Sequence, residues 1–259
     1  MTQTPQFITA MLGLPIPELA LIIIAFWSSI AVIVHRLLVP LIAGTHGEKL
    51  GRLEAEVASQ LGIVLGLLLS FNAVTVWEQS SAARDATLAE ASALREVADM
   101  APDLPPEQRS ELLSALHAYL RYVIDTEWPT LRADVVSLNK PEPLRQLDHL
   151  GHTAGQGDLH DAISAAVRAR EDRLRIATAR MLPARWGIVM FLGILTLLAM
   201  GLLHAEHRRA RVVSLSMITF AIASCFVVLM AQARPFLGTL AIKPTELSAL
   251  DAELQASQR

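Results

Sequence analysis

The side chains that could contact an ion, judged by residue type and spacing, lie in one apolar stretch, residues 57–77, and just after it. Leu61, Leu68, Asn72, Thr75 and Gln79 are spaced for one stripe of a helix, which becomes more polar toward its end. Amide and hydroxyl oxygens can replace part of the water shell of an ion, and leucines can close a pore by dewetting. The stripe therefore predicts the pore-lining residues of a channel.

Two of the polar residues also have a structural interpretation. Asn72 can instead hydrogen-bond to a neighbouring helix, because an amide that faces lipid is costly. Glu78 would lie at the pore mouth, where a ring of carboxylates favours cations, but a salt bridge to Arg84 is an equal alternative. The sequence leaves both choices open, and with them the selectivity.

Small residues form a second stripe on the same stretch. Ala58, Gly62, Gly66 and Ser70 recur every four residues, which is the pattern that lets two membrane helices approach closely. We therefore expect these positions to pack against another helix. That helix can belong to the same subunit or to a neighbouring one.

No spacing in the sequence is typical of an enzyme. There is no P-loop, no G-x-S-x-G and no H-E-x-x-H, so we expect no catalytic residue, no cofactor and no enzymatic activity. Histidines gather in two places, but neither group has a recognised ligand spacing, so we expect no metal site. The two groups are His149, His152, Asp158, His160 and Asp161, and His204, Glu206 and His207.

Four apolar stretches must position these residues. They cover residues 16–39, 57–77, 186–203 and 212–233, and each has about the 20 helical residues that cross a bilayer core. With 53% hydrophobic residues and a net charge of only -3, the chain is expected to act in the membrane and not on nucleic acid. The sequence predicts an all-α integral membrane protein with four transmembrane helices.

The spans divide the chain into four segments. Residues 1–78 form an N-terminal segment and a first transmembrane hairpin, and residues 186–234 form a second hairpin. Between them, residues 79–185 are predicted to be a helical soluble insert. In this insert the spacing of apolar residues predicts helices at 106–127 and 131–138, a loop at 151–157 and a long helix returning to the membrane.

Residues 235–259 are predicted to be a tail with a short amphipathic helix, whose apolar stripe is Leu247, Leu250 and Leu254. Arg234, at the end of the fourth span, can extend to the lipid headgroups. Alternatively, Arg234 and Phe236 anchor the tail against a neighbouring element. The sequence allows both roles.

Blocks of the sequence resemble a known family. They are Gly62-Ile-Val-Leu-Gly66, Phe71-Asn-Ala-Val-Thr-Val-Trp-Glu78, Glu127-Trp-Pro129 and Arg234-Pro-Phe-Leu-Gly238. In this order they are similar to the bestrophin-like domain family of bacterial and plant membrane proteins. That family is distantly similar to bestrophins, which are pentameric ion channels with four spans, a cytoplasmic helical part between spans two and three, and a pore lined by span two.

The resemblance implies an oligomeric ion channel, most simply a pentamer, in a bacterial inner membrane. Its partners would be the lipid bilayer, inorganic ions and further copies of the chain, with the insert and both termini in the cytoplasm. The sequence has no clear copy of the bestrophin calcium clasp, and no aromatic residues at i, i+4 and i+8 in span two. Calcium gating and selectivity are therefore not implied.

A second interpretation comes from another class of protein. The chain could be a non-conducting membrane scaffold or sensor whose helical insert binds a partner. A symmetric assembly with span two around a water-wide axis would favour the channel. A tightly packed monomer or dimer would favour the scaffold.

Overall fold

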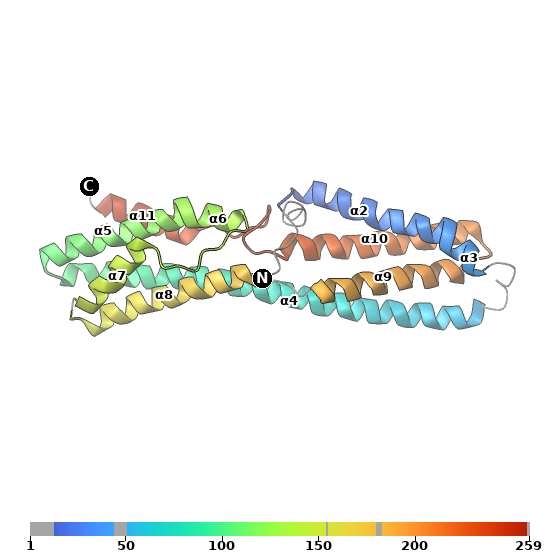
Figure 1. The fold of residues 1–259 in the computed structure, drawn as a ribbon, viewed down its shortest axis with the longest axis horizontal. Coiled ribbons are helices and arrows are strands. Elements are labelled where there is room, and N and C mark those ends of the chain that lie inside the picture. Colours follow the sequence, from blue (N-terminus) through green and yellow to red (C-terminus); the bar gives the residue numbers. More distant parts are fainter. Residues whose placement is uncertain (1–12, 44–50, 154, 180–182, 258–259) are drawn as a thin grey trace. The chain divides into compact units, whose positions relative to one another are not determined.

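The computed structural model describes residues 13–43, 51–153, 155–179 and 183–257, and within these ranges every regular element is a helix (Figure 1). The predicted all-α fold is confirmed. The chain forms two compact units. We call Met1–Trp77 with Arg180–Ala233 the membrane unit, and Glu78–Ala179 with Arg234–Arg259 the insert unit.

In the part of the chain that the structure describes, four helices are long and apolar enough to cross a membrane, as predicted. The candidate spans are Ile16–Ile42, Ala55–Asp103, Ala184–Leu203 and Arg208–Gln232. The second is part of α4 (Gly51–Met100), a helix of 50 residues that runs without interruption from the membrane unit into the insert unit. One helix therefore contributes to both cores.

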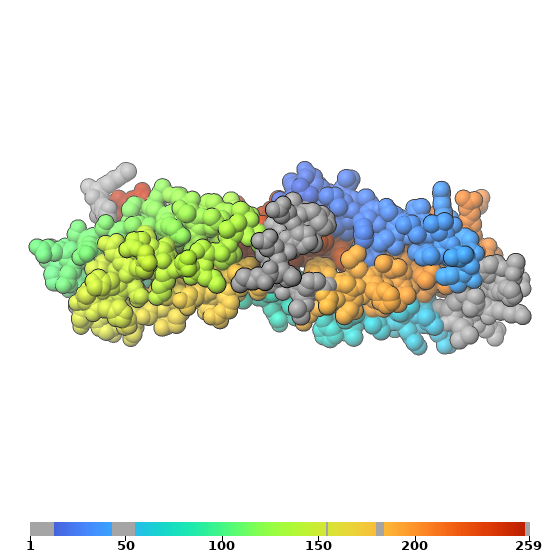
Figure 2. All heavy atoms as spheres, viewed as in Figure 1, coloured from blue at the N-terminus to red at the C-terminus, as the bar shows by residue number. Residues whose placement is uncertain are grey.

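In the membrane unit, α10 (Arg208–Gln232) packs against both α2 (Ile16–Ile33) and α9 (Pro183–Leu203). Figure 2 shows α2, α9 and α4 following one another across the viewed face of this unit. Trp27 of α2 is buried, with its ring 5.1 Å from that of Phe226. A Cβ atom at Gly193 of α9 would lie 2.6 Å from the Trp27 ring, so the absence of a side chain there makes room for the indole.

Between α2 and α3 (Val39–Ala43) lies a π-helical turn, η1 (Val34–Leu38). Its wider turn brings Val34 and Val39, five residues apart and both fully buried, against Gly201 of α9. Pro40 lacks the amide hydrogen of a regular helix and follows two residues after η1. The same order recurs in the insert unit, where η4 (Val123–Glu127) precedes Pro129.

The insert unit has one apolar core, to which α4, α5, α6, α7, α8 and α11 all contribute. After α4, the chain makes a short turn, η3 (Ala101–Asp103). The remaining elements are α5 (Pro106–Tyr122), η4, α6 (Trp128–Arg132), α7 (Glu142–Thr153), α8 (Gly157–Thr178) and α11 (Thr245–Ser257). Within α11, the predicted stripe of Leu247, Leu250 and Leu254 is buried in this core.

Two local predictions for the insert are wrong. The helix expected at 131–138 ends at Arg132, because Asp134 adopts a left-handed conformation with φ of 60°. Between this segment and the predicted loop at 151–157, where the sequence made no prediction, α7 begins; Pro143 is in its first turn, where no amide hydrogen is required. The predicted loop at 151–157 begins later, because Gly151 is still helical and packs closely against Ile163.

The contact between Gly193 and Trp27 gives a stability prediction. Gly193→Ala would drive a methyl group into the indole, and we expect it to cost about 1–3 kcal/mol, as overpacking in a core does. The apparent midpoint of thermal unfolding of the detergent-solubilised protein should therefore fall. Gly187→Ala on the same helix is the control, since its Cβ would meet nothing within 4 Å; equal midpoints for both variants would contradict the contact.

Candidate functional site

In each unit, one side of α4 is buried by the rest of the chain. Six of its buried positions are spaced by seven or eleven residues, which correspond to nearly whole numbers of helical turns. They are Ala58, Leu65 and Val76 in the membrane unit, and Ala83, Glu90 and Val97 in the insert unit. In each unit, these positions mark the covered face of α4.

The opposite face of α4 is uncovered in the single chain. Ile63, Leu67 and Phe71 lie roughly half a turn from the buried positions, with 68%, 54% and 61% of their surface exposed. In the insert unit, α4 carries the carboxylates of Glu78, Asp85, Glu96 and Asp99, all of them exposed. We call the exposed set in each unit the uncovered face of α4; its part in the membrane unit is apolar and its part in the insert unit is acidic.

The predicted pore-lining residues lie beside the covered face. The structure gives intermediate burial to Leu61, Leu68, Asn72, Thr75 and Gln79. Asn72 donates from Nδ2 to the Leu68 carbonyl at 2.8 Å, and Thr75 donates to the Phe71 carbonyl at 2.9 Å. Their hydrogen bonds thus return to their own helix, and among the described residues Asn72 bonds to no other helix.

The small-residue stripe is mostly open in the single chain. Ala58 is buried, but a Cβ at Gly62 or Gly66 would meet nothing within 4 Å, and Ser70 is exposed. The Ser70 hydroxyl donates to the Gly66 carbonyl at 2.9 Å. Close packing at Gly62 and Gly66 is therefore not supplied by the described part of the same chain.

Glu78 is exposed, and among the described residues neither it nor Arg84 takes part in an ion pair. The salt bridge considered as an alternative to a carboxylate ring does not form in the single chain. Glu78 instead begins the acidic part of the uncovered face.

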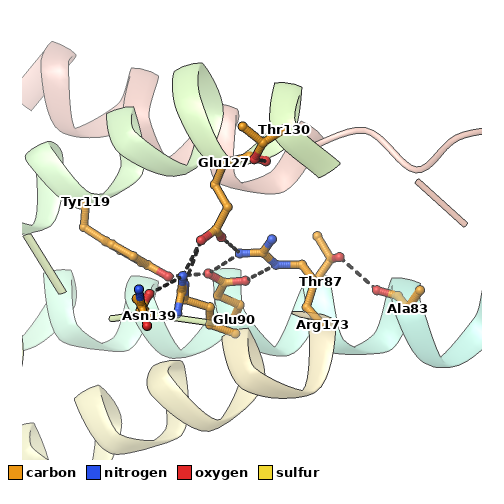
Figure 3. A network of polar contacts seen from close by, with 9 residues as sticks. Ala83, Thr87, Glu90, Tyr119, Glu127, Thr130, Asn139 and Arg173 are labelled. Carbon is orange, nitrogen blue, oxygen red and sulfur yellow. Dashed lines mark hydrogen bonds and ion pairs between the residues drawn. The ribbon is translucent and has the colours of Figure 1, made fainter. Parts of the chain in front are cut away.

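A group of buried charges ties three parts of the insert unit together (Figure 3). Glu90 comes from α4, Glu127 from η4, and Arg170 and Arg173 from α8. Arg173 Nε lies 2.6 Å from Glu90 Oε2, and Arg173 Nη2 lies 2.7 Å from Glu127 Oε1. Arg170 donates to the second Glu127 oxygen, from Nε at 3.0 Å and also from Nη2. Two carboxylates and two guanidinium groups balance, so the core holds no net charge.

Neighbouring side chains complete this charge group. Tyr119 of α5 donates its hydroxyl to Glu90 Oε1 at 2.6 Å, and burial together with the Glu90 charge raises the pKa of this phenol well above its ordinary value. Burial alone would lower the pKa of Arg173, but Glu90 and Glu127 raise it above its ordinary value, so this residue stays charged. The Trp128 ring covers its guanidinium at 4.9 Å.

The sequence analysis did not recognise this group. Its signal is the spacing of Glu127, which follows Leu116, Leu120 and Val123 on the buried stripe of α5 and η4. A carboxylate at such a position requires a buried cation, and α8 offers Arg170 and Arg173 on its own buried stripe.

The residues predicted to anchor the tail contact the insert unit of the same chain. Arg234 Nη2 lies 2.6 Å from Asp134 Oδ1, and Nη1 lies 3.4 Å from the Ala177 carbonyl. The Phe236 ring meets Trp128 edge-on, with centroids 5.6 Å apart, and Trp128 Nε1 donates to the Ile242 carbonyl at 3.1 Å. The Glu-Trp-Pro and Arg-Pro-Phe blocks are thus in direct contact.

The histidine groups have no evident ligand set. Among the described residues no three His, Cys, Asp or Glu side chains are placed to hold a metal ion. In the first group, the His152 and His160 rings lie 4.3 Å apart. In the second, His204 Nδ1 lies 3.3 Å from the Met200 carbonyl.

A family model and solved structures both match this chain. A model described as Bestrophin-like domain matches residues 23–247. No curated protein matches the sequence. Among solved structures, a bacterial bestrophin homologue from Klebsiella pneumoniae, crystallised as several variants, matches with a TM-score of 0.66 at 16% identity, over 92% of this chain and 96% of that chain. A second variant gives 0.65 at 19% identity, over 92% and 98%.

Because of the buried charge group, we expect substitutions of two arginines on α8 to lower the free energy of unfolding by different amounts. Arg173→Met leaves Glu90 and Glu127 buried with too little positive charge, which should cost about 3–5 kcal/mol of unfolding free energy. Arg175→Met, whose side chain is exposed and pairs with Asp172, should cost less than about 1 kcal/mol. Chemical denaturation followed by circular dichroism measures both, and similar losses would show that the buried pairing is not what stabilises the unit.

Proposed function

This chain belongs to the Bestrophin-like domain family, and from this premise we propose that several copies of it assemble around an axis as an ion channel lined by α4. The uncovered face of α4 supports the proposal. Ile63, Leu67 and Phe71 are exposed in the single chain and can form an apolar constriction, and the residues of α4 that follow them are acidic. In a ring of α4 helices, both parts of this face would line the central axis.

The direction of the covered face suggests which residues turn toward the axis. In a ring whose innermost helix is α4, the side that packs on its own subunit points outward. The opposite side, with Ile63, Leu67 and Phe71, then forms an apolar constriction. The originally predicted stripe with Asn72 and Thr75 is the second candidate for the pore face, because it holds the polar side chains of the span.

The small-residue stripe lies between the covered face and the uncovered face. Gly62 and Gly66 would let α4 of the neighbouring copy approach closely, which a wider residue would prevent. This contact would close the ring, most simply of five copies, in a bacterial inner membrane with the insert and both termini in the cytoplasm.

The acidic part of the uncovered face favours cations over anions. Glu78, Asp85, Glu96 and Asp99 would each form a ring of carboxylates along the axis. Such rings raise the local concentration of cations and repel chloride. The channel proposed here is therefore selective for cations.

Single-channel recording in planar bilayers tests the constriction. Phe71→Ala should raise the conductance, by about twofold or more, because a wider and wetter constriction passes ions more easily. Phe220→Ala is the matched control, since Phe220 is equally exposed but lies on α10. If Asn72→Leu changes the conductance and Phe71→Ala does not, the pore face is the originally predicted stripe; no current from the wild-type protein would favour the scaffold.

Reversal potentials in a potassium chloride gradient test the selectivity. The double variant Asp85→Asn/Glu96→Gln should move the reversal potential toward zero, because it removes two carboxylates of the uncovered face in every copy. Glu107→Gln/Glu111→Gln, two exposed carboxylates of α5, is the control and should leave the potential unchanged. A wild-type preference for chloride would contradict the proposal.

A further inference from the structure

We propose that the membrane unit binds the phosphate of an anionic phospholipid headgroup with an arginine cluster at one end. The cluster consists of Arg36 with His35 on η1, and Arg208, Arg209 and Arg211 at the start of α10. These two segments meet at one end of the membrane unit (Figure 1). Arg211 donates from Nε to His35 Nδ1 at 3.0 Å and from Nη1 to the Ala205 carbonyl at 3.3 Å.

The hydrogen bond between Arg211 and His35 arranges the donors of the cluster. Because His35 Nδ1 accepts this bond, the ring is neutral and its proton is on Nε2, which is free to donate. The charges of Arg211, Arg208 and Arg36 all act on the same imidazole. The hydrogen bond joins η1 to α10, so arginines of both segments lie at the same end of the membrane unit.

The described carboxylates do not balance the cluster. Among the described residues, no ion pair involves Arg36, Arg208, Arg209 or Arg211, and the first turn of α10 holds no acidic residue. Glu206, two residues before α10, is exposed and takes part in no ion pair with the described residues. The N-terminus of a helix carries a partial positive charge itself, so arginines there add to it. In the insert unit, Arg95, Arg121, Arg170, Arg173 and Arg175 are paired with carboxylates, whereas the exposed Arg84, Arg132 and Arg168 form no ion pair with the described residues. An anion from outside the chain would supply the missing charge.

The position of the cluster favours a lipid over a soluble anion. Only a four-residue turn separates the spans that end at Leu203 and begin at Arg208, so the arginines of α10 lie at the boundary of the apolar region. Arg36 lies within the first span, about a turn and a half before Ile42, and its long side chain reaches toward the same boundary. Phosphodiester groups of lipids lie at this depth, and guanidinium groups bind them with paired hydrogen bonds.

Native mass spectrometry of the full-length protein in detergent tests the site. Phosphatidylglycerol and phosphatidylcholine are added at equal concentrations, and inorganic phosphate is added in a parallel sample. We expect phosphatidylglycerol to stay bound and phosphatidylcholine to be lost. Arg36→Gln/Arg208→Gln/Arg209→Gln should weaken phosphatidylglycerol binding at least about tenfold, whereas Lys at the same three positions should weaken it much less. Arg211 is kept, because it holds His35.

A matched control removes the same charge elsewhere. Arg132→Gln/Arg145→Gln/Arg168→Gln takes three exposed arginines from the insert unit and should bind phosphatidylglycerol as the wild type does. Equal affinity of the cluster variant and this control would overturn the proposal, as would equal retention of the two lipids. Displacement of phosphatidylglycerol by millimolar inorganic phosphate would assign the cluster to a soluble anion instead. The measurement involves no current, so its result is independent of conduction.

Discussion

The pairing of Arg173 with Glu90 and Glu127 is the interaction that joins the parts of the insert unit. It links α4, η4 and α8, which are far apart in the sequence, through side chains that are almost completely buried. Removing such charges from water costs several kcal/mol per ion, which only close and complementary partners can offset. The π-helical turn η4 serves this requirement, because it directs Glu127 to the arginines and the adjacent Trp128 to Phe236 and Ile242 of the tail. The charge group and the tail contact are therefore built from one short segment.

Features that depend on composition or on the helical spacing of apolar residues are predicted well. The four spans follow from hydropathy, and the stripe of Leu247, Leu250 and Leu254 correctly marks the buried side of α11. Prediction fails where this spacing is interrupted. Asp134 ends a helix by a backbone conformation that its residue type permits but does not require, and Gly151 is helical where its glycine-rich segment predicted a loop.

The candidate site was harder to predict, for a different physical reason. Spacing shows that Leu61, Leu68 and Asn72 share one stripe, and that Gly62 and Gly66 share another. It does not show which stripe the rest of the chain covers, because that depends on tertiary packing in the membrane unit. The stripe chosen for its polar residues borders the covered face, whereas Ile63, Leu67 and Phe71 are exposed. Apolar side chains seemed unremarkable in a membrane span, so only the tertiary structure draws attention to them.

The continuity of α4 connects these two findings. An α-helix without an internal proline or π-helical turn resists twisting, so the direction of one residue determines the direction of the others. Glu90 points into the insert core to meet Arg173, and Ala83 is buried on the same side of α4. In the membrane unit, Leu65 is buried in the apolar core, whereas Phe71 is exposed. The charge group therefore fixes the direction of α4 within the insert unit, and apolar packing fixes it within the membrane unit.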